Sequence, residues 1–85
     1  MPRFFFHIRN GNGFTRDEEG CELADVDAAR DVAGRGIRSL LAEEVHEGSI
    51  DLRGAINVTD EAGEPLFSMR FDEALRIDTG DPPPG

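Results

Sequence analysis

Apolar residues recur at spacings of three and four positions in the middle of the chain, between residues 25 and 48. On a helix that turns about 100° per residue they form one stripe; they are Val26, Ala29, Ala33, Ile37, Leu40 and Leu41. Asp25 is a favourable N-cap, because its carboxylate can accept a backbone N–H of the first turn. Gly48 can adopt the left-handed conformation that ends a helix. The pattern predicts one helix over about residues 25–47, with its apolar face packed on a flat surface.

Three residues within this predicted helix depart from an ideal amphipathic pattern. Gly34 and Gly36 each cost roughly 1 kcal/mol relative to alanine, and we expect Gly36 to allow close packing against a sheet. Glu44 falls near the centre of the apolar stripe, one turn before its end. We expect its side chain to extend past the edge of the sheet into water.

The residues on both sides of the helix alternate between apolar and polar types, as residues of strands do. The predicted extended segments are, in order, residues 3–9, 14–16, 21–23, 51–60, 65–71 and 75–77. Turns rich in glycine, asparagine and acidic residues separate them at 10–13, 17–20, 61–64 and 72–74. Residues 78–85 include Pro82-Pro83-Pro84 and are expected to form a loose tail.

Segments 21–23 and 75–77 are short extended pieces, and the four predicted strands are 3–9, 14–16, 51–60 and 65–71. With the helix, the order of elements is therefore β-β-α-β-β. It predicts a two-layer α+β sandwich, in which one antiparallel sheet is covered on one face by the single helix. We expect a single domain over residues 1–77, as the length of 85 residues allows. The predicted core consists of Phe4, Phe6, Ile8, Val26, Ala29, Ala33, Ile37, Leu40, Leu41, Ile56, Val58, Phe67, Met69 and Phe71.

One helix leaves the other face of the sheet uncovered, and we call this surface the open face. By the alternation of the strands, its residues are Arg3, Phe5, His7, Arg9, Arg53, Asn57, Thr59, Leu66, Ser68 and Arg70, joined by Arg76. None of these residues is an aspartate or glutamate, although the chain has 18 acidic and nine basic residues. This segregation of charge makes the open face the candidate interaction surface, with Arg3, Phe5, His7, Arg9, Arg53, Asn57 and Arg70 as its central residues.

Composition narrows the classes of function. The net charge of −9 argues against non-specific binding to nucleic acid or to an anionic membrane. A single cysteine excludes an intrachain disulfide, and two histidines at unrelated spacings give no zinc pattern. No apolar run approaches the roughly 20 residues of a membrane helix. We expect a soluble, cytoplasmic protein without metal or cofactor.

No catalytic constellation can be assembled from the pattern. His7 is the best titratable candidate, but neither an acid partner nor a nucleophile is placed beside it. Cys21 lies next to Glu22 and lacks the positive surroundings that activate a thiol. The glycines of residues 10–13 join two strands and do not precede a helix, so they do not form a phosphate-binding loop. We expect a non-enzymatic protein.

Three interpretations of the open face stay available. It can be a solvated sheet face, with arginine stems covering apolar surface. It can be a protein interface, for which arginine beside an aromatic residue is typical. It can also bind single-stranded nucleic acid by stacking on Phe5, an interpretation that the net charge opposes.

Three segments carry a resemblance to a family: Pro2-Arg3-Phe4-Phe5-Phe6-His7; Asp17-Glu18-Glu19-Gly20 with Glu22-Leu23 and Asp25; and Val58-Thr59-Asp60-Glu61 with Gly63. Over about residues 1–77 the chain resembles a family of short bacterial proteins known as a domain of unknown function, which implies no activity. Over residues 17–41 it has a weaker likeness to the HicB antitoxins, which would imply an inhibitor of a small RNA-cleaving toxin.

The preferred interpretation of the sequence is a protein-interaction module that uses the open face or an exposed strand edge. A homodimer is its simplest form, because unpaired sheet edges invite self-pairing.

Overall fold

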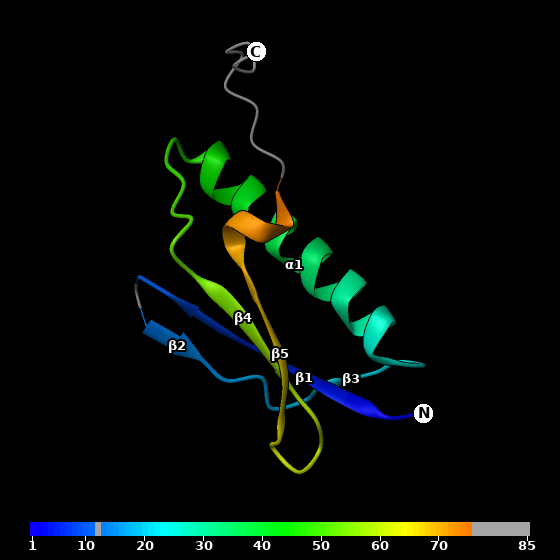
Figure 1. Cartoon of the computed structure of the whole chain (residues 1–85). Helices are drawn as coiled ribbons and strands as arrows, with labels where there is room; N and C mark the ends of the chain where they lie inside the picture. The colour runs from blue at the N-terminus through cyan, green and yellow to red at the C-terminus, as the bar shows by residue number, and fades with distance from the viewer. Residues whose placement is uncertain (12, 76–85) are drawn as a thin grey trace, which may run out of the picture.

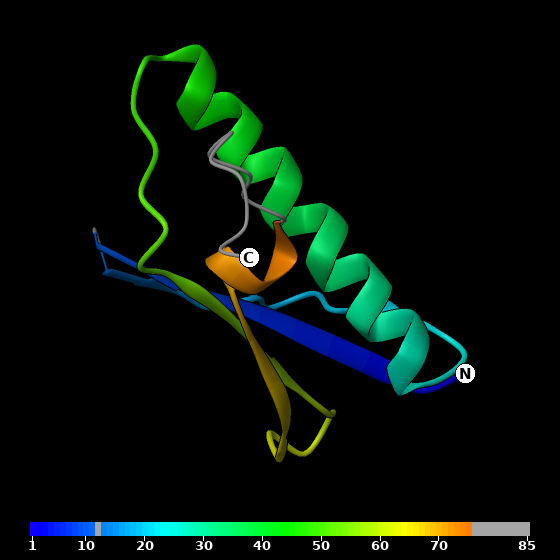
Figure 2. The ribbon, with the colours of Figure 1, turned by 45° about the horizontal axis from the view of Figure 1, so that its top comes forward.

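The computed structural model describes residues 1–11 and 13–75. Within them, one five-stranded antiparallel sheet is accompanied by one long helix (Figure 1). The elements are β1 (Arg3–Asn10), β2 (Gly13–Thr15), β3 (Cys21–Glu22), α1 (Val26–His46), β4 (Ala55–Thr59), β5 (Pro65–Arg70) and the 3₁₀ helix η1 (Phe71–Ala74). Figure 2 shows that α1 and η1 lie on the same face of the sheet. The predicted α+β fold with a single antiparallel sheet and a single helix is confirmed. The described residues include neither Arg76 and Ile77 of the predicted segment 75–77 nor the predicted tail 78–85.

Strand β1 organises the sheet. On one side it pairs with β4 over five residues, from Phe5 opposite Thr59 to Arg9 opposite Ala55. On its other side it pairs with two short strands in succession, β3 near its beginning and β2 near its end. The sheet order is β2-β1-β4-β5, so β5 forms one edge and the β2/β3 pair forms the other.

The ends of α1 follow the predicted capping chemistry. The Asp25 carboxylate accepts the Ala28 N–H at 2.8 Å. At the other end Gly48 has φ +98°, its N–H donates to the Val45 carbonyl, and the Ser49 N–H donates to the Glu44 carbonyl. These two bonds form a Schellman motif, which satisfies carbonyl groups that the last turn would otherwise leave free.

The apolar stripe of α1 packs on the sheet with one exception. Ala29, Ala33, Ile37 and Leu41 are buried, and Leu40 is half-buried. Val26 is 39% exposed, so its predicted place in the core is wrong. The first turn of the helix lies near the beginning of β1, at the margin of the sheet (Figure 2).

The surroundings of Gly36 and Glu44 in α1 differ from those that we expected. A Cβ added at Gly36 would lie 3.9 Å from Ile56 Cδ1, an ordinary contact, so close packing does not require glycine there. Glu44 is half-buried rather than free in water. Its Oε1 accepts the Asp51 N–H at 2.9 Å and fastens the chain that follows the helix.

Strand β4 is shorter than the predicted segment 51–60. The Asp51 carboxylate accepts both the backbone N–H and the Nε–H of Arg53, at 3.0 and 2.9 Å, which folds residues 51–53 into a local turn. Gly54 is buried between Phe71 and β1, and a Cβ there would lie 2.6 Å from the Arg9 carbonyl oxygen. Its own carbonyl accepts the Phe71 N–H at 2.9 Å. Phe71 therefore begins η1 instead of ending β5, although its predicted place in the core is confirmed.

The core lies between α1, η1 and the sheet. The buried cluster contains Phe4, Ala29, Ala33, Ile37, Leu41, Ile56, Val58 and Phe71. Partly buried side chains surround it, namely Phe6, Ile8, Leu23, Leu40, Leu52, Phe67, Met69, Ala74 and Leu75. Over residues 1–11 and 13–75, no helix has the length and apolar character that crossing a membrane requires.

Candidate functional site

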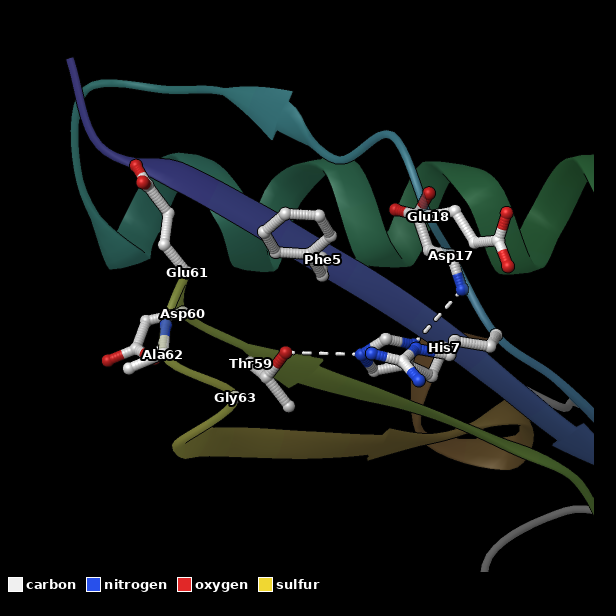
Figure 3. Close-up of a pocket in the computed structure, with 10 residues that line it drawn as sticks. Phe5, His7, Asp17, Glu18, Thr59, Asp60, Glu61, Ala62 and Gly63 are labelled. Carbon is white, nitrogen blue, oxygen red and sulfur yellow. Dashed lines mark hydrogen bonds between the residues drawn. The ribbon is translucent and has the colours of Figure 1, made fainter.

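Strand pairing brings several of the residues predicted for the open face side by side. Phe5 and His7 of β1 lie beside Thr59 and Asn57 of β4, and Ser68 of β5 lies beside Asn57. Figure 3 views this face with α1 behind the strands. Arg3, Arg9 and Arg70 lie on strands, whereas Arg53 lies in the turn before β4. Among the predicted residues, Arg53 is thus placed by its loop and not by a strand.

Most of these arginines have acidic partners. Arg3 forms an ion pair with Glu22 of β3 at 3.1 Å, and Arg53 pairs with Asp51 at 2.9 Å. Arg70 pairs with Asp72 and Glu73 of η1 at 3.1 and 3.2 Å. The hydrogen bonds from Arg53 lower the pKa of Asp51 to about 2. Such exposed pairs contribute little to stability, but they neutralise the charge of the three arginines. Within the described residues, Arg9 has no ion-pair partner.

A row of rings crosses the open face. The Phe5 and His7 rings are nearly parallel, 7° apart, with centroids separated by 6.5 Å. The His7 and Phe14 centroids are 5.9 Å apart. Phe14 pairs with Arg9 across the β1–β2 hairpin and is 58% exposed. Sequence reasoning did not assign Phe14 to this surface. The register of the hairpin, with Asn10 opposite Gly13, is the signal that would have placed it there.

His7 is held in one tautomer by its two hydrogen bonds (Figure 3). Its Nδ1 lies 3.0 Å from the Asp17 backbone nitrogen, which can only donate, so Nδ1 is the acceptor. Nε2 therefore carries the proton and donates to Thr59 Oγ1 at 3.1 Å. In a hydrolase triad the polarity is reversed, because Nε2 must accept the nucleophile's proton. His7 and Thr59 do not form a catalytic dyad in this arrangement.

Asp17 joins the bend at residues 17–20 to β1. Its Oδ2 accepts the Phe6 N–H at 3.0 Å, and its Oδ1 accepts the N–H groups of Glu19 and Gly20 at 3.2 and 3.1 Å. Partial burial raises the pKa of Asp17, but these backbone hydrogen bonds and the proximity of His7 lower it by more, so the net pKa lies below 3.8. Neither β2 nor β3 pairs with β1 at Phe6. The Asp17 carboxylate therefore accepts the Phe6 N–H in place of a strand carbonyl.

The bend is pressed closely on β1. Gly20 has φ +71°, and a Cβ there would lie 2.9 Å from the Phe4 carbonyl oxygen and from a ring atom of Phe5. The Asp60 carboxylate organises the β4–β5 loop in a similar way, accepting the N–H groups of Ala62 and Glu64 at 2.9 Å. The two acidic segments of the family resemblance are therefore turns closed by an aspartate.

These two turns flank a shallow hollow of about 530 Å³ on the open face (Figure 3). Phe5, His7 and Thr59 contribute to its floor, and the lining includes Arg16, Asp17, Glu18, Asp60, Glu61, Ala62 and Gly63. Asp17 and Asp60 are occupied by backbone donors. The carboxylates of Glu18 and Glu61 have no hydrogen-bond or ion-pair partner in the part of the chain that the structure describes. Glu22 of β3, opposite Arg3, is the acidic residue that the described strand rows of the open face contain. The turns bring four further carboxylates to one end of the face.

No metal-binding arrangement is found in residues 1–11 and 13–75, where no group of three or more His, Cys, Asp or Glu side chains is placed to hold an ion. Cys21 is exposed on β3 and lies away from the hollow's lining. The chemistry that the site offers is therefore recognition by rings, carboxylates and an arginine.

Comparison with known proteins places the chain in a family. No curated protein and no solved structure shows a significant match to it, so the likeness to HicB antitoxins is not supported. The model of DUF6894, a domain of unknown function, matches residues 3–72. This range includes nearly all of the three segments on which the resemblance was based, and it extends from β1 into η1. The chain belongs to the DUF6894 family.

Proposed function

We propose that this protein is a small non-enzymatic interaction module that binds another protein through its open face, with a second copy of the chain as the simplest partner. The observation that supports the proposal is the row of rings formed by Phe5, His7 and Phe14 on the face that α1 does not cover. Aromatic residues and arginine are enriched at the centres of protein interfaces.

The exposure of Phe14 gives the row an energetic consequence. With 58% of its surface accessible, burial of Phe14 would remove roughly 115 Å² of apolar surface from water, worth about 3 kcal/mol. In a free monomer the exposed part of this ring contributes no burial free energy to the stability of the fold. A partner that covers it recovers that free energy.

The open face is a better candidate than a strand edge. Between β4 and β5, Val58 pairs with Phe67 and Thr59 pairs with Pro65. Leu66 of β5 is therefore an extra residue that interrupts the ladder. A bulge and a proline are devices that discourage pairing at an edge. The other edge consists of two strands of only three and two residues.

Single-stranded nucleic acid is the alternative ligand, because bases also stack on rings. The four carboxylates around the hollow and the net charge of −9 would repel phosphates from the same surface. Binding to an oligonucleotide that weakens steeply with salt would favour this alternative.

The proposal is tested by measuring the solution mass by light scattering and sedimentation over a range of protein concentrations. We expect a wild-type dimer whose dissociation constant rises at least tenfold in Phe14→Ala. Val45→Ala is the matched control, because Val45 is an equally exposed apolar side chain, 59%, on α1. A wild-type chain that stays monomeric, or equal effects of the two substitutions, would refute self-association through the open face.

A further inference from the structure

The open face carries opposite charge at its two ends. At one end Arg9, Ala55 and Arg70 form a row across β1, β4 and β5. Arg70 is neutralised by η1, which leaves the Arg9 guanidinium as the uncompensated charge of this row in the described chain. At the other end Phe5 lies beside Thr59, and Glu18 and Glu61 line the hollow there with carboxylates that have no partner among the described residues.

These two ends are placed symmetrically about the middle of the face. Phe5 and Arg9 lie two residues on either side of His7 along β1, and Thr59 and Ala55 lie two residues on either side of Asn57 along β4. A two-fold axis across the strands at the level of His7 and Asn57 exchanges the ends. It would set Arg9 of one copy over Phe5 of the other.

We propose that two copies of the chain pack open face to open face about this axis, with Arg9 of each copy entering the hollow of the other between Glu18 and Glu61. The inference rests on the proposed function and specifies its partner and geometry. An isologous contact of this kind uses one self-complementary surface twice and closes as a dimer. The product is a four-layer assembly of helix, sheet, sheet and helix.

The lining of the hollow has four acidic residues against one arginine, Arg16, so its net charge attracts a guanidinium. An arginine over an aromatic ring gains from the electrostatic attraction of the ring, and carboxylates accept its N–H groups. The same molecule already contains such a contact on the covered side of its sheet, where the Arg30 guanidinium lies 4.5 Å from the centre of the Phe67 ring. The volume of about 530 Å³ leaves room for the side chain of Arg9.

The centre of the open face allows two sheets to approach. The side chains that β4 and β5 present there are short: Ala55, Asn57, Thr59 and Ser68. Asn57 Oδ1 accepts the Ser68 hydroxyl at 2.7 Å, so two of these polar groups are satisfied within the sheet. Sheets packed face to face keep their strands within about 30° of each other, which preserves the exchange of ends.

Charge reversal tests this arrangement. In sedimentation experiments we expect Arg9→Glu and Glu61→Arg each to raise the dimer dissociation constant at least tenfold. The double variant Arg9→Glu, Glu61→Arg should return to within about threefold of the wild-type value, because each reversed residue then faces its complement. An equimolar mixture of the two single variants should also dimerise, since a mixed pair contains both complementary contacts. Arg35→Glu on α1, which pairs with Asp31 within the chain, is the control that changes charge away from the open face.

The outcomes separate the two proposals. Rescue in the double variant and in the mixture supports the two-fold arrangement. A wild-type dimer that is weakened by Phe14→Ala but not by either reversal overturns the arrangement and leaves binding through the open face in place. A wild-type monomer overturns both the two-fold arrangement and self-association through the open face. If that monomer binds oligothymidine and Arg9→Glu abolishes the binding, the face belongs to nucleic acid. Both reversed residues are exposed, so the variants should fold, and far-UV circular dichroism is the measurement that checks this.

Discussion

Replacement of Asp17 by alanine removes the group that joins the 17–20 bend to β1. Three backbone N–H groups lose their acceptor, those of Phe6, Glu19 and Gly20. The Phe6 bond is part-buried, and loss of a charge-assisted bond of this kind costs about 1.5 kcal/mol, whereas the two bonds within the bend cost about 0.5 kcal/mol each. We expect Asp17→Ala to lower the free energy of unfolding by about 2.5 kcal/mol, a large fraction of the few kcal/mol that stabilise a domain of this size.

A graded series separates the hydrogen bonds from the charge. Asp17→Asn retains one carbonyl oxygen for the bend but turns an amide N–H₂ toward the Phe6 N–H, so it should cost about 1.5 kcal/mol. Glu19→Ala is the control, because the Glu19 side chain makes no hydrogen bond or ion pair within the described chain. The assay is urea unfolding followed by far-UV circular dichroism, since the chain has neither tryptophan nor tyrosine. All variants are compared at one protein concentration, because association would add stability.

The pH dependence gives an independent check. The folded state holds the pKa of Asp17 below its unfolded value of 3.8, so the carboxylate stabilises the fold above that pH. Its contribution is lost as the pH falls through the folded-state pKa. The difference between wild type and Asp17→Ala should therefore persist from pH 7 to about pH 4 and shrink below it. This account of the bend is refuted if the free energy of unfolding of Asp17→Ala at pH 7 lies within about 0.5 kcal/mol of wild type, the scatter of neutral surface substitutions. It is also refuted if the difference between the two proteins does not change in acid.

Two further predictions concern packing, and both use the same unfolding assay. Gly36→Ala should stabilise the protein by about 0.5–1 kcal/mol, because alanine is the better helix former and its Cβ would make only an ordinary contact with Ile56. Gly54→Ala should destabilise the protein by about 1–3 kcal/mol, because its Cβ would overlap the Phe71 ring and crowd the Arg9 carbonyl. Equal effects of the two substitutions would contradict the packing described at these positions. Phe71→Ala should cost about 3–5 kcal/mol, and Phe6→Ala should cost less, because Phe6 is only partly buried and borders a second hollow beside the bend. A larger loss for Phe6 than for Phe71 would show that the centre of the core is misplaced.

The sequence determined the parts of this protein that depend on near neighbours. The N-cap at Asp25 and the C-terminal turn at Gly48 follow from residues within a few positions of each helix end. The inward row of β1 and the apolar stripe of α1 follow from periodicities of two and 3.6 residues. These features are local in the chain, so they can be predicted before any contact between elements is known.

Local periodicity was insufficient where one element limits another. Val26 matches the apolar stripe, but it lies in the first turn of α1 and is exposed. Residues 51–53 match the alternation of a strand, yet Asp51 folds them into a turn. Phe71 matches β5 and instead begins η1, because its N–H donates to Gly54 and its ring fills the centre of the core.

The candidate site was decided by tertiary structure. His7 and Thr59 are 52 residues apart, and only the pairing of β1 with β4 brings them together. The acidic partners of Arg3 and Arg70 come from β3 and η1, outside the alternating rows that defined the open face. Periodicity assigns a side chain to a face, but charge balance and ring contacts depend on strand order and on where turns return the chain. For this reason the sequence identified the open face, and only the fold revealed its aromatic row, its acidic hollow and the position of Arg9.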